Sequence, residues 1–234
     1  MHVEVIAMVY KSVDYLNFIA EQLASMSEIG VRIVANDPTA KVQERLSHAG
    51  VPFTIYNDPH PAQYYINRVY RCWNHCVVSS KAEKVCLVNS DMYFSDGWLE
   101  PLTKACDEGF LPTSRLVESG KMRSGTHGLS KNFGRHPREF RKEAWLKYAE
   151  SIKQGVMEDG GLKMPVVFKR DEFISAGMYP EGNVYKDGIG TLNGPVVCPG
   201  DRWFFQKFCD KTGRQHKTCF NSIVYHIQEG EIDE

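Results

Sequence analysis

The sequence predicts an α/β fold with a mostly parallel central sheet flanked by helices. Short runs rich in Val, Ile and Tyr alternate with stretches whose apolar residues recur at helical spacing. Strands that alternate with helices are joined by right-handed crossovers and so line up in parallel. The chain has 234 residues, of which 42% are hydrophobic, and shows no repeat or low-complexity linker. We therefore expect one domain spanning residues 1–234.

Four strands and three helices are expected to alternate in the first half of the chain. The first helix has apolar residues at helical spacing and ends where Gly30 stops the pattern. The predicted strands are 3–10, 31–35, 52–56 and 84–88, and the helices between them are 14–29, 40–49 and 62–79.

The second half is less regular and is expected to elaborate the same domain. Its predicted strands are 110–117, 166–169 and 223–226, and its predicted helices are 137–154, 171–176 and 201–211. Residues 120–134 are predicted to form a loop, and residues 182–200 a second loop that is rich in Gly and Pro.

Several function classes are excluded or disfavoured by what the sequence lacks. It contains neither the GxGxxG fingerprint of dinucleotide-binding enzymes nor the GxxxxGK[ST] motif of P-loop enzymes. Its seven cysteines include no CxxC pair, which argues against a zinc ribbon or a disulfide framework. No apolar run approaches the ~18 residues of a membrane span, and the first residues do not resemble a signal peptide. We therefore expect a cytoplasmic protein, in the host cytoplasm if the source is viral, with no integral membrane segment.

Acidic and amide side chains follow the predicted strands where each strand ends. Asp37 comes after the second strand, and Asn89, Ser90 and Asp91 come after the fourth. Ligands of parallel sheets bind beyond the carboxyl ends of the strands. A carboxylate there can accept hydrogen bonds from a nucleotide's base or ribose, and another can hold a divalent cation beside a diphosphate.

Four motifs occur in an order that resembles a known family. An Asp follows the second strand, VCLVNSDMYF resembles an Asp-x-Asp motif after an apolar strand, and PGDRWFFQKFCDKTG is a helix that opens on an acid. NSIVYHIQEGE closes the chain with a strand that runs into a histidine. This order resembles the nucleotide-sugar-dependent glycosyltransferases of the GT-A fold, especially the inverting family two. The resemblance implies a single GT-A (Rossmann-like) domain with a nucleotide-sugar-binding half, 1–110, and an acceptor-binding and catalytic half, 111–234.

The resemblance also implies a role for individual residues. Asp91 and His226 would bind the metal, and the imidazole makes Mn²⁺ a better match than Mg²⁺. Asp201 would be the general base that takes the proton from the acceptor hydroxyl, although a plain helix cap is its alternative role and the two can coexist. The residues expected to contact the nucleotide sugar are Val9, Tyr10, Asp37, Asn89 and Ser90.

The sequence departs from the family pattern in ways that bear on function. Asn89 stands where the family has the first acid of Asp-x-Asp, and Gly200 stands where a Glu precedes the catalytic Asp. The QxxRW motif of processive synthases is missing, so transfer of a single sugar is expected. The alternative hypothesis is a non-catalytic GT-A-like domain that binds a sugar nucleotide or a glycan.

The net charge of −1 hides a basic segment. Residues 111–142 contain 8 Lys and Arg against 2 Asp and Glu, where the resemblance places acceptor recognition. Three interpretations stay open: a solvated surface, a clamp on the donor's diphosphate, or a site for an anionic acceptor such as a lipid-linked glycan or a hydroxymethylated DNA base. The candidate acceptor or polyanion contacts are Arg123, Lys131, Arg135, Arg138 and Trp203.

Overall fold

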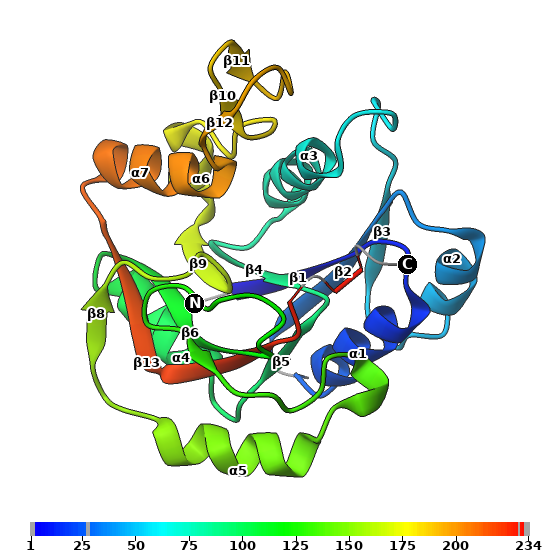
Figure 1. The fold of residues 1–234 in the computed structure, drawn as a ribbon, viewed down its shortest axis with the longest axis vertical. Coiled ribbons are helices and arrows are strands. Elements are labelled where there is room, and N and C mark those ends of the chain that lie inside the picture. The colour runs from blue at the N-terminus through cyan, green and yellow to red at the C-terminus, as the bar shows by residue number, and fades with distance from the viewer. Residues whose placement is uncertain (1–2, 27–28, 229, 232–234) are drawn as a thin grey trace.

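A mixed sheet runs through the centre of the computed structural model, which describes residues 3–26, 29–228 and 230–231 (Figure 1). Within this part of the chain the sheet has ten strands, eight of them in the order β3-β2-β1-β4-β9-β6-β13-β5, with β7 paired to β6 and β8 to β13. Their bounds are β1 Val3–Val9, β2 Gly30–Asn36, β3 Phe53–Tyr56, β4 Lys84–Asn89, β5 Met92–Phe94, β6 Phe110–Glu118, β7 Leu129–Ser130, β8 Met157–Asp159, β9 Val166–Lys169 and β13 Gln215–His226.

The first half of the chain forms the parallel part of this sheet, as the alternating pattern predicts. Strands β3, β2, β1 and β4 are all parallel. The residues of β4 from Val85 to Val88 are fully buried, as expected for a strand covered on both faces. In Figure 1, α3, α6 and α7 lie on one side of the sheet and α1 and α5 on the other. The helices are α1 Val13–Ala24, α2 Ala40–Leu46, α3 Tyr65–Ser79, α4 Leu99–Asp107, α5 Lys142–Ile152, α6 Arg170–Ala176 and α7 Gly200–Thr212.

The second half adds antiparallel and parallel partners to the same sheet. Strand β9 is antiparallel to β4, and β13 is parallel to β6 but antiparallel to β5 and β8. The last strand begins at Gln215 and not at the predicted residue 223. A register shift between Cys219 and Ile223 interrupts its pairing with β6, and this irregularity breaks the sequence pattern of one long strand. The result is a single α/β domain with a mostly parallel central sheet.

The helix predicted over 137–154 is divided in two. A 3-10 turn, η1 (Pro137–Glu139), comes first, and α5 begins only at Lys142. The turn is capped by His136, whose Nδ1 accepts a hydrogen bond from the Arg138 N–H at 3.2 Å. Phe140 and Arg141 then have non-helical backbone angles, so the helix starts anew after them.

The predicted loop over 182–200 contains a small three-stranded sheet. Its strands are β10 Val184–Tyr185, β11 Gly188–Ile189 and β12 Val196–Cys198, in the order β11-β10-β12. Strands of two or three residues leave too short a pattern to recognise in the sequence. The sheet lies beyond α6 and α7, away from the central sheet (Figure 1).

The core of the protein consists of a large apolar cluster, which includes residues of α1, α3 and α7, and a smaller second cluster. The second cluster joins Trp145 of α5 to Tyr225 of β13, and both side chains are fully buried. Val224 belongs to the first cluster. Because successive side chains of a strand point to opposite faces, His226 lies on the same face as Val224 and points away from α5. This alternation directs His226 toward the face covered by α3.

Among the described helices, none combines the length and the apolarity that crossing a membrane requires.

Candidate active site

A cavity of about 380 Å³ opens at the carboxyl ends of the parallel strands. This is where a sheet of this topology binds its ligands, and the volume is in the range of small-molecule sites. The strands contribute their last residues and the turns that follow them, α3 forms one wall, and the end of the described chain forms another. The lining residues are Met8, Val9, Tyr10, Lys11, Asn36, Tyr65, Ile66, Val69, Trp73, Asn89, Ser90, Asp91, His226, Gly230 and Glu231.

The cavity brings together most of the donor and metal candidates of the sequence. The register of β1 and β4 pairs Met8 with Asn89, so that the turns after both strands reach the same edge of the sheet. His226 arrives from the other half of the chain at the end of β13. The candidates that line the cavity are Val9, Tyr10, Asn89, Ser90, Asp91 and His226.

His226 lies between two carboxylates. Its Nε2 is 3.1 Å from Asp91 Oδ2, and its Nδ1 is 3.2 Å from Glu118 Oε1. Burial alone would lower the pKa of His226, but the two carboxylates outweigh it and raise the pKa to about 10. Burial would conversely raise the pKa of Asp91, and the facing imidazolium lowers it below its usual value. Glu118, which no motif in the sequence marks, is therefore part of this site.

The Asp91 and His226 pair suits a divalent cation that a ligand also helps to hold. The described residues contain no group of three or more His, Cys, Asp or Glu side chains arranged to hold a metal ion. Two ligands still fit a metal that completes its shell with substrate phosphates and water. The Glu118 carboxylate beside Nδ1 favours a proton on that nitrogen, so a metal would bind at Nε2 and replace the proton that the imidazolium carries there, an arrangement common around metal-binding histidines.

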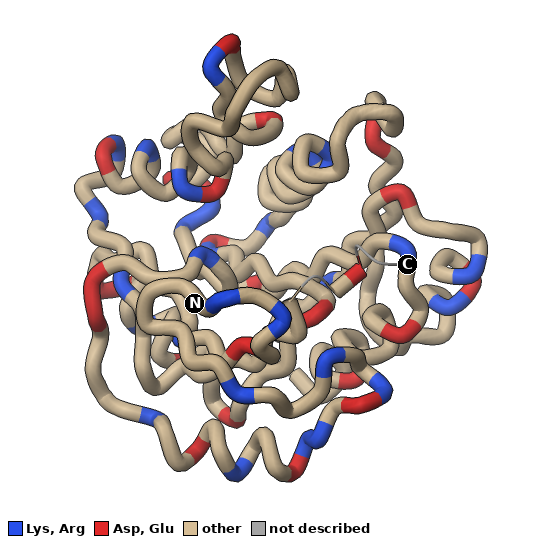
Figure 2. Tube along the Cα trace, in the orientation of Figure 1, with Lys and Arg blue, Asp and Glu red and all other residues tan. Residues whose placement is uncertain are grey.

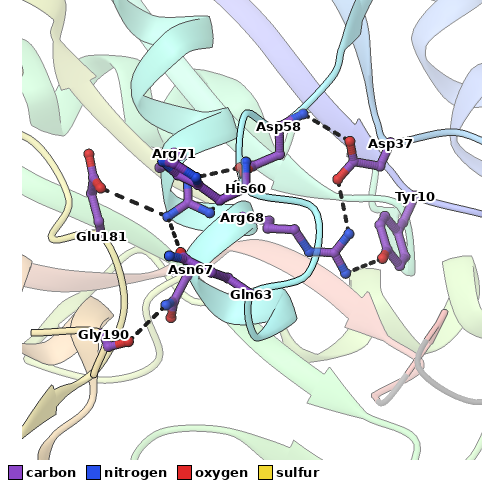
Figure 3. A network of polar contacts seen from close by, with 10 residues as sticks. All are labelled: Tyr10, Asp37, Asp58, His60, Gln63, Asn67, Arg68, Arg71, Glu181 and Gly190. Carbon is purple, nitrogen blue, oxygen red and sulfur yellow. Dashed lines mark hydrogen bonds and ion pairs between the residues drawn. The ribbon is translucent and has the colours of Figure 1, made fainter. Parts of the chain in front are cut away.

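Asp37 lies beside the cavity and not in its lining. Its Oδ2 is 3.0 Å from Arg68 Nη1, and its Oδ1 accepts a hydrogen bond from the Asp58 N–H at 2.9 Å. Arg68 in turn donates to the Tyr10 hydroxyl and lies over the Tyr10 ring (Figure 3). Both oxygens of Asp37 are thus engaged by the protein, and its carboxylate holds Arg68 and Tyr10 in place.

The residue before it, Asn36, faces the cavity instead. Its side chain is 1% exposed, and its Oδ1 has no hydrogen-bond partner among the described residues. A buried polar atom without a partner is costly in a protein, so Oδ1 of Asn36 requires a partner from outside the chain, such as a ligand or a water. No pattern in the sequence separates Asn36 from Asp37, because both stand at the end of the same strand.

A second network joins α3 to the turn after β3, to the residues before β10 and to the residue after β11. Arg71 forms a two-bond pair with Asp58, with Nε to Oδ2 at 2.9 Å and Nη2 to Oδ1 at 2.8 Å (Figure 3). Burial would raise the pKa of Asp58, but the Arg71 guanidinium outweighs it and lowers the pKa. Arg71 Nη1 also lies 3.8 Å from Glu181 Oε2, and Asn67 Nδ2 donates to the Gly190 carbonyl at 3.1 Å. These contacts fix one wall of the cavity.

Asp201 lies at the start of α7, opposite α3, and does not line the cavity. Its Oδ1 accepts a hydrogen bond from the Arg202 N–H at 2.6 Å, and its own N–H donates to the Tyr70 hydroxyl at 2.9 Å. The packing also accounts for Gly200, because a Cβ there would lie 2.4 Å from Tyr70 Cε2 and 2.6 Å from the Gly182 carbonyl oxygen. A Glu at position 200 therefore has no room in this structure.

Many cations of the basic segment contact other parts of the chain. Lys131 Nζ lies 3.7 Å from the centre of the Tyr148 ring, and Arg138 Nη2 is 2.7 Å from Asp14 Oδ2. Arg123 and Arg135 are exposed. Figure 2 shows Lys and Arg interspersed with Asp and Glu along the whole trace and not gathered on one face.

Trp203, the remaining acceptor candidate, is half-buried on α7. Lys207 Nζ lies 4.3 Å from the centre of its ring, so one face of the indole is covered by the same helix. None of the five acceptor candidates lines the cavity.

Comparison with known proteins identifies the fold. No family model matches the chain, and no curated protein matches it. Among solved structures, the chain is similar to S. aureus TarS, with 13% identity and a TM-score of 0.60, over 97% of this chain and 36% of that one. A TarS structure of residues 1–349 matches with the same identity and score over 60% of its length. GalNAc-T7 with UDP, GalNAc and Mn²⁺ matches with 11% identity and a TM-score of 0.55, over 96% of this chain and 43% of that one.

The chain thus spans between about a third and three fifths of the length of these three solved structures. At these sequence identities the similarity shows a shared fold, and it does not show a shared activity or substrate. Together with the strand order and the helices on both faces of the sheet, it shows that the chain is a single α/β domain with the GT-A fold.

Proposed function

We propose that this chain is a glycosyltransferase that moves one sugar from a nucleoside-diphosphate sugar to an acceptor hydroxyl, with inversion at the anomeric carbon. The observation that carries the proposal is the meeting of Asp91 and His226, from opposite halves of the chain, in a cavity that Asn89 and Ser90 also line. GalNAc-T7, which has a similar fold, has been solved with UDP, GalNAc and Mn²⁺, and this supports the same class of donor and metal here.

The proposed donor contacts come from the first half of the chain, and the second half adds the proposed metal ligand His226. Val9, Tyr10, Asn89 and Ser90 contact the nucleotide sugar, and the unpartnered Oδ1 of Asn36 adds an acceptor for an N–H group. Asp37 acts through Arg68, which it holds against Tyr10. The proposed division into a nucleotide-sugar-binding half, 1–110, and an acceptor-binding half, 111–234, is therefore crossed by His226.

Asp91 and His226 are the proposed metal ligands, with Glu118 orienting the imidazole. A bound Mn²⁺ or Mg²⁺ would neutralise the charge that develops on the departing nucleoside diphosphate.

Asp201 is the proposed general base. In the transfer, the acceptor oxygen forms a bond to the anomeric carbon while the bond from that carbon to the diphosphate oxygen breaks. The acceptor's proton passes to the Asp201 carboxylate, and the electron pair leaves with the diphosphate. The Arg202 N–H donates a hydrogen bond to the Asp201 carboxylate. Asp201 lies in the first turn of α7 and is not its N-cap, because that position is taken by Pro199.

The proposed acceptor is a glycan or a lipid-linked glycan, and a hydroxymethylated DNA base is the anionic alternative suggested by the basic segment. Exposed Arg123 and Arg135 are the strongest candidates for contact with an anionic acceptor, because Lys131 and Arg138 contact Tyr148 and Asp14.

A donor screen tests the proposal. Nucleoside diphosphates and their sugars are mixed with the protein in the presence and absence of Mn²⁺, and melting temperature and donor hydrolysis are measured. We expect one nucleotide class to stabilise the protein, and Mn²⁺-dependent hydrolysis or transfer to disappear in Asp91→Ala and Asp201→Ala. Stabilisation without turnover of any donor would favour the alternative, a non-catalytic sugar-nucleotide-binding domain. Neither stabilisation nor turnover would refute both.

A further inference from the structure

The carboxylate of Glu231 lies in a seat of four hydrogen-bond donors at the edge of the cavity. Its Oε2 accepts from three consecutive backbone N–H groups, those of Tyr10 at 2.9 Å, Lys11 at 2.6 Å and Ser12 at 3.0 Å. Its Oε1 accepts from the Ser90 hydroxyl at 2.6 Å. The donors come from the turn after β1 and the turn after β4, whereas the carboxylate comes from beyond β13. We call these four donors the anion seat.

The preceding residue holds the same segment against the proposed metal ligand. A Cβ on Gly230 would lie 2.6 Å from Asp91 Cβ and 3.0 Å from Asp91 Oδ2, so only glycine allows the chain to approach so closely. The Gly230 N–H also bonds to the Asp91 carboxylate. In Figure 1 the red end of the chain runs back to the carboxyl ends of β1 and β2.

Converging backbone N–H groups form a concave site that suits any small anionic oxygen cluster, whether carboxylate or phosphate. The cavity offers a further sign that a ligand belongs there, because Oδ1 of Asn36 is buried in its lining without a partner and Glu231 does not satisfy it. The carboxylates of Glu231 and Asp91 line the same small cavity. An anionic nucleotide that enters it is repelled by Glu231 as long as that side chain remains.

We propose that the anion seat is a binding site for phosphate oxygens of the nucleotide, and that Glu231 is a built-in competitor that occupies the seat and is displaced when the nucleotide binds. This inference rests on the proposed function for the identity of the ligand, but the seat and its occupation by Glu231 can be tested separately. The apparent Kd for the nucleotide equals the intrinsic Kd divided by the fraction of molecules in which the anion seat is open. If Glu231 fills the seat in about nine-tenths of the molecules, nucleotide binding is therefore weakened about tenfold.

Two variants of the full chain open the seat by different routes. Glu231→Ala removes the competing carboxylate, and Gly230→Ala keeps it but forces the segment away from Asp91. Glu158→Ala is the matched control, because Glu158 is exposed on β8 and does not line the cavity. We expect the Kd for UDP or GDP with Mn²⁺, measured by calorimetry, to fall about tenfold in both variants and to stay unchanged in the control. Unchanged or weaker nucleotide binding in Glu231→Ala would overturn the proposal.

Amide exchange measured by NMR tests the seat without any nucleotide. The N–H groups of Tyr10, Lys11 and Ser12 are expected to exchange at least tenfold faster in Glu231→Ala than in the unmodified chain or the control. Inorganic phosphate should restore their protection in Glu231→Ala, whereas sodium chloride at equal ionic strength should not. Unchanged exchange rates, or no protection by phosphate, would overturn the anion seat. If neither the unmodified chain nor any variant binds a nucleotide, while phosphate still restores protection in Glu231→Ala, the proposed function is refuted and the anion seat is supported as a site for phosphate alone.

Discussion

Glu118 and His226 are register partners at the ends of the parallel strands β6 and β13, and the Glu118 carboxylate lies 3.2 Å from Nδ1 of His226. On its other side, His226 faces Asp91. The pairing means that the orientation of the imidazole is set by the sheet itself, before any ligand arrives.

If Nε2 of His226 binds a metal ion, Glu118 should increase the affinity of the site for that ion. Glu118→Gln keeps the size of the side chain but removes its charge, and we expect Mn²⁺ binding in the presence of nucleoside diphosphate to weaken by about 10- to 100-fold. Calorimetry on the full chain measures this, with Glu158→Gln as the exposed control on β8. Equal Mn²⁺ affinity in Glu118→Gln and the unmodified chain would show that the carboxylate plays no part in metal binding.

Asp201 should affect turnover and not donor binding. Asp201→Asn retains a side-chain oxygen for the Arg202 N–H but cannot take up the acceptor proton, so we expect kcat to fall by about 10²- to 10⁴-fold. The Kd for the nucleotide and the melting temperature should change little. Asp210→Asn, an exposed change near the other end of α7, is the control. A fall in stability with normal kcat would assign Asp201 a structural role alone.

Asn36 should contribute to recognition of the nucleotide at no cost to stability. Replacing it by Ala removes an acceptor that has no partner within the described chain, so we expect unchanged or slightly higher stability. Loss of one hydrogen bond to the ligand is worth about 0.5–1.5 kcal/mol, which weakens nucleotide binding by up to about tenfold. Thermal melts and calorimetry measure the two effects, with the exposed Asn193→Ala as control. Destabilisation with normal nucleotide affinity would mean that Asn36 has only a structural role.

The buried Asp58 and Arg71 pair should hold α3 in place and make stability depend on pH. The Asp58 side chain is 0% exposed and that of Arg71 is 8% exposed, so Asp58→Asn leaves a buried cation without its partner and should cost about 3–5 kcal/mol at neutral pH. The pKa of Asp58 is lower in the folded chain than the value of about 3.9 in the unfolded chain.

The contribution of Asp58 is therefore complete above the unfolded pKa and is lost as the pH falls through the folded pKa. Urea denaturation at a series of pH values from neutral to strongly acidic should show the unmodified chain and Asp58→Asn converging only on the acid side. A constant difference across that range would contradict this account, and Asp210→Asn should show no such effect at any pH.

The exposed arginines of the basic segment should contribute to the binding of an anionic acceptor. If the acceptor is DNA, Arg123→Ala combined with Arg135→Ala should weaken binding and lower the slope of log affinity against log salt by about 2, because each arginine would neutralise one phosphate. Arg138→Ala, which breaks the ion pair with Asp14, should change that slope less. Binding of DNA that is insensitive to salt, or no binding by the unmodified chain, would remove DNA from the acceptor classes.

Hydrophobic periodicity was enough to predict the parallel half of the sheet, because it reports local structure and the apolar runs of β1, β2 and β4 are stable only when they are buried in the core. Because parallel strands in one sheet share a carboxyl edge, the sequence also predicted that Asp37 and Asp91 follow strands that end at that edge, whereas a place for His226 beside Asp91 was implied only by the family resemblance. Short strands and strands with an irregular register could not be predicted from the sequence. Strand β5 has three residues, and the register shift within β13 breaks the pattern of a long strand.

Which side chains line the cavity depends on packing and strand register, and these are visible only in the tertiary structure. Asn36 and Asp37 are neighbours in the sequence, yet Asp37 adopts a left-handed backbone with φ of 48° and turns its carboxylate to Arg68, while Asn36 lines the cavity. The partnership of Glu118 with His226 depends on strand register, and the seat of Glu231 depends on a segment that returns across the sheet from beyond β13. Contacts between residues so distant in sequence leave no local pattern, because packing and register bring them together only after the chain has folded.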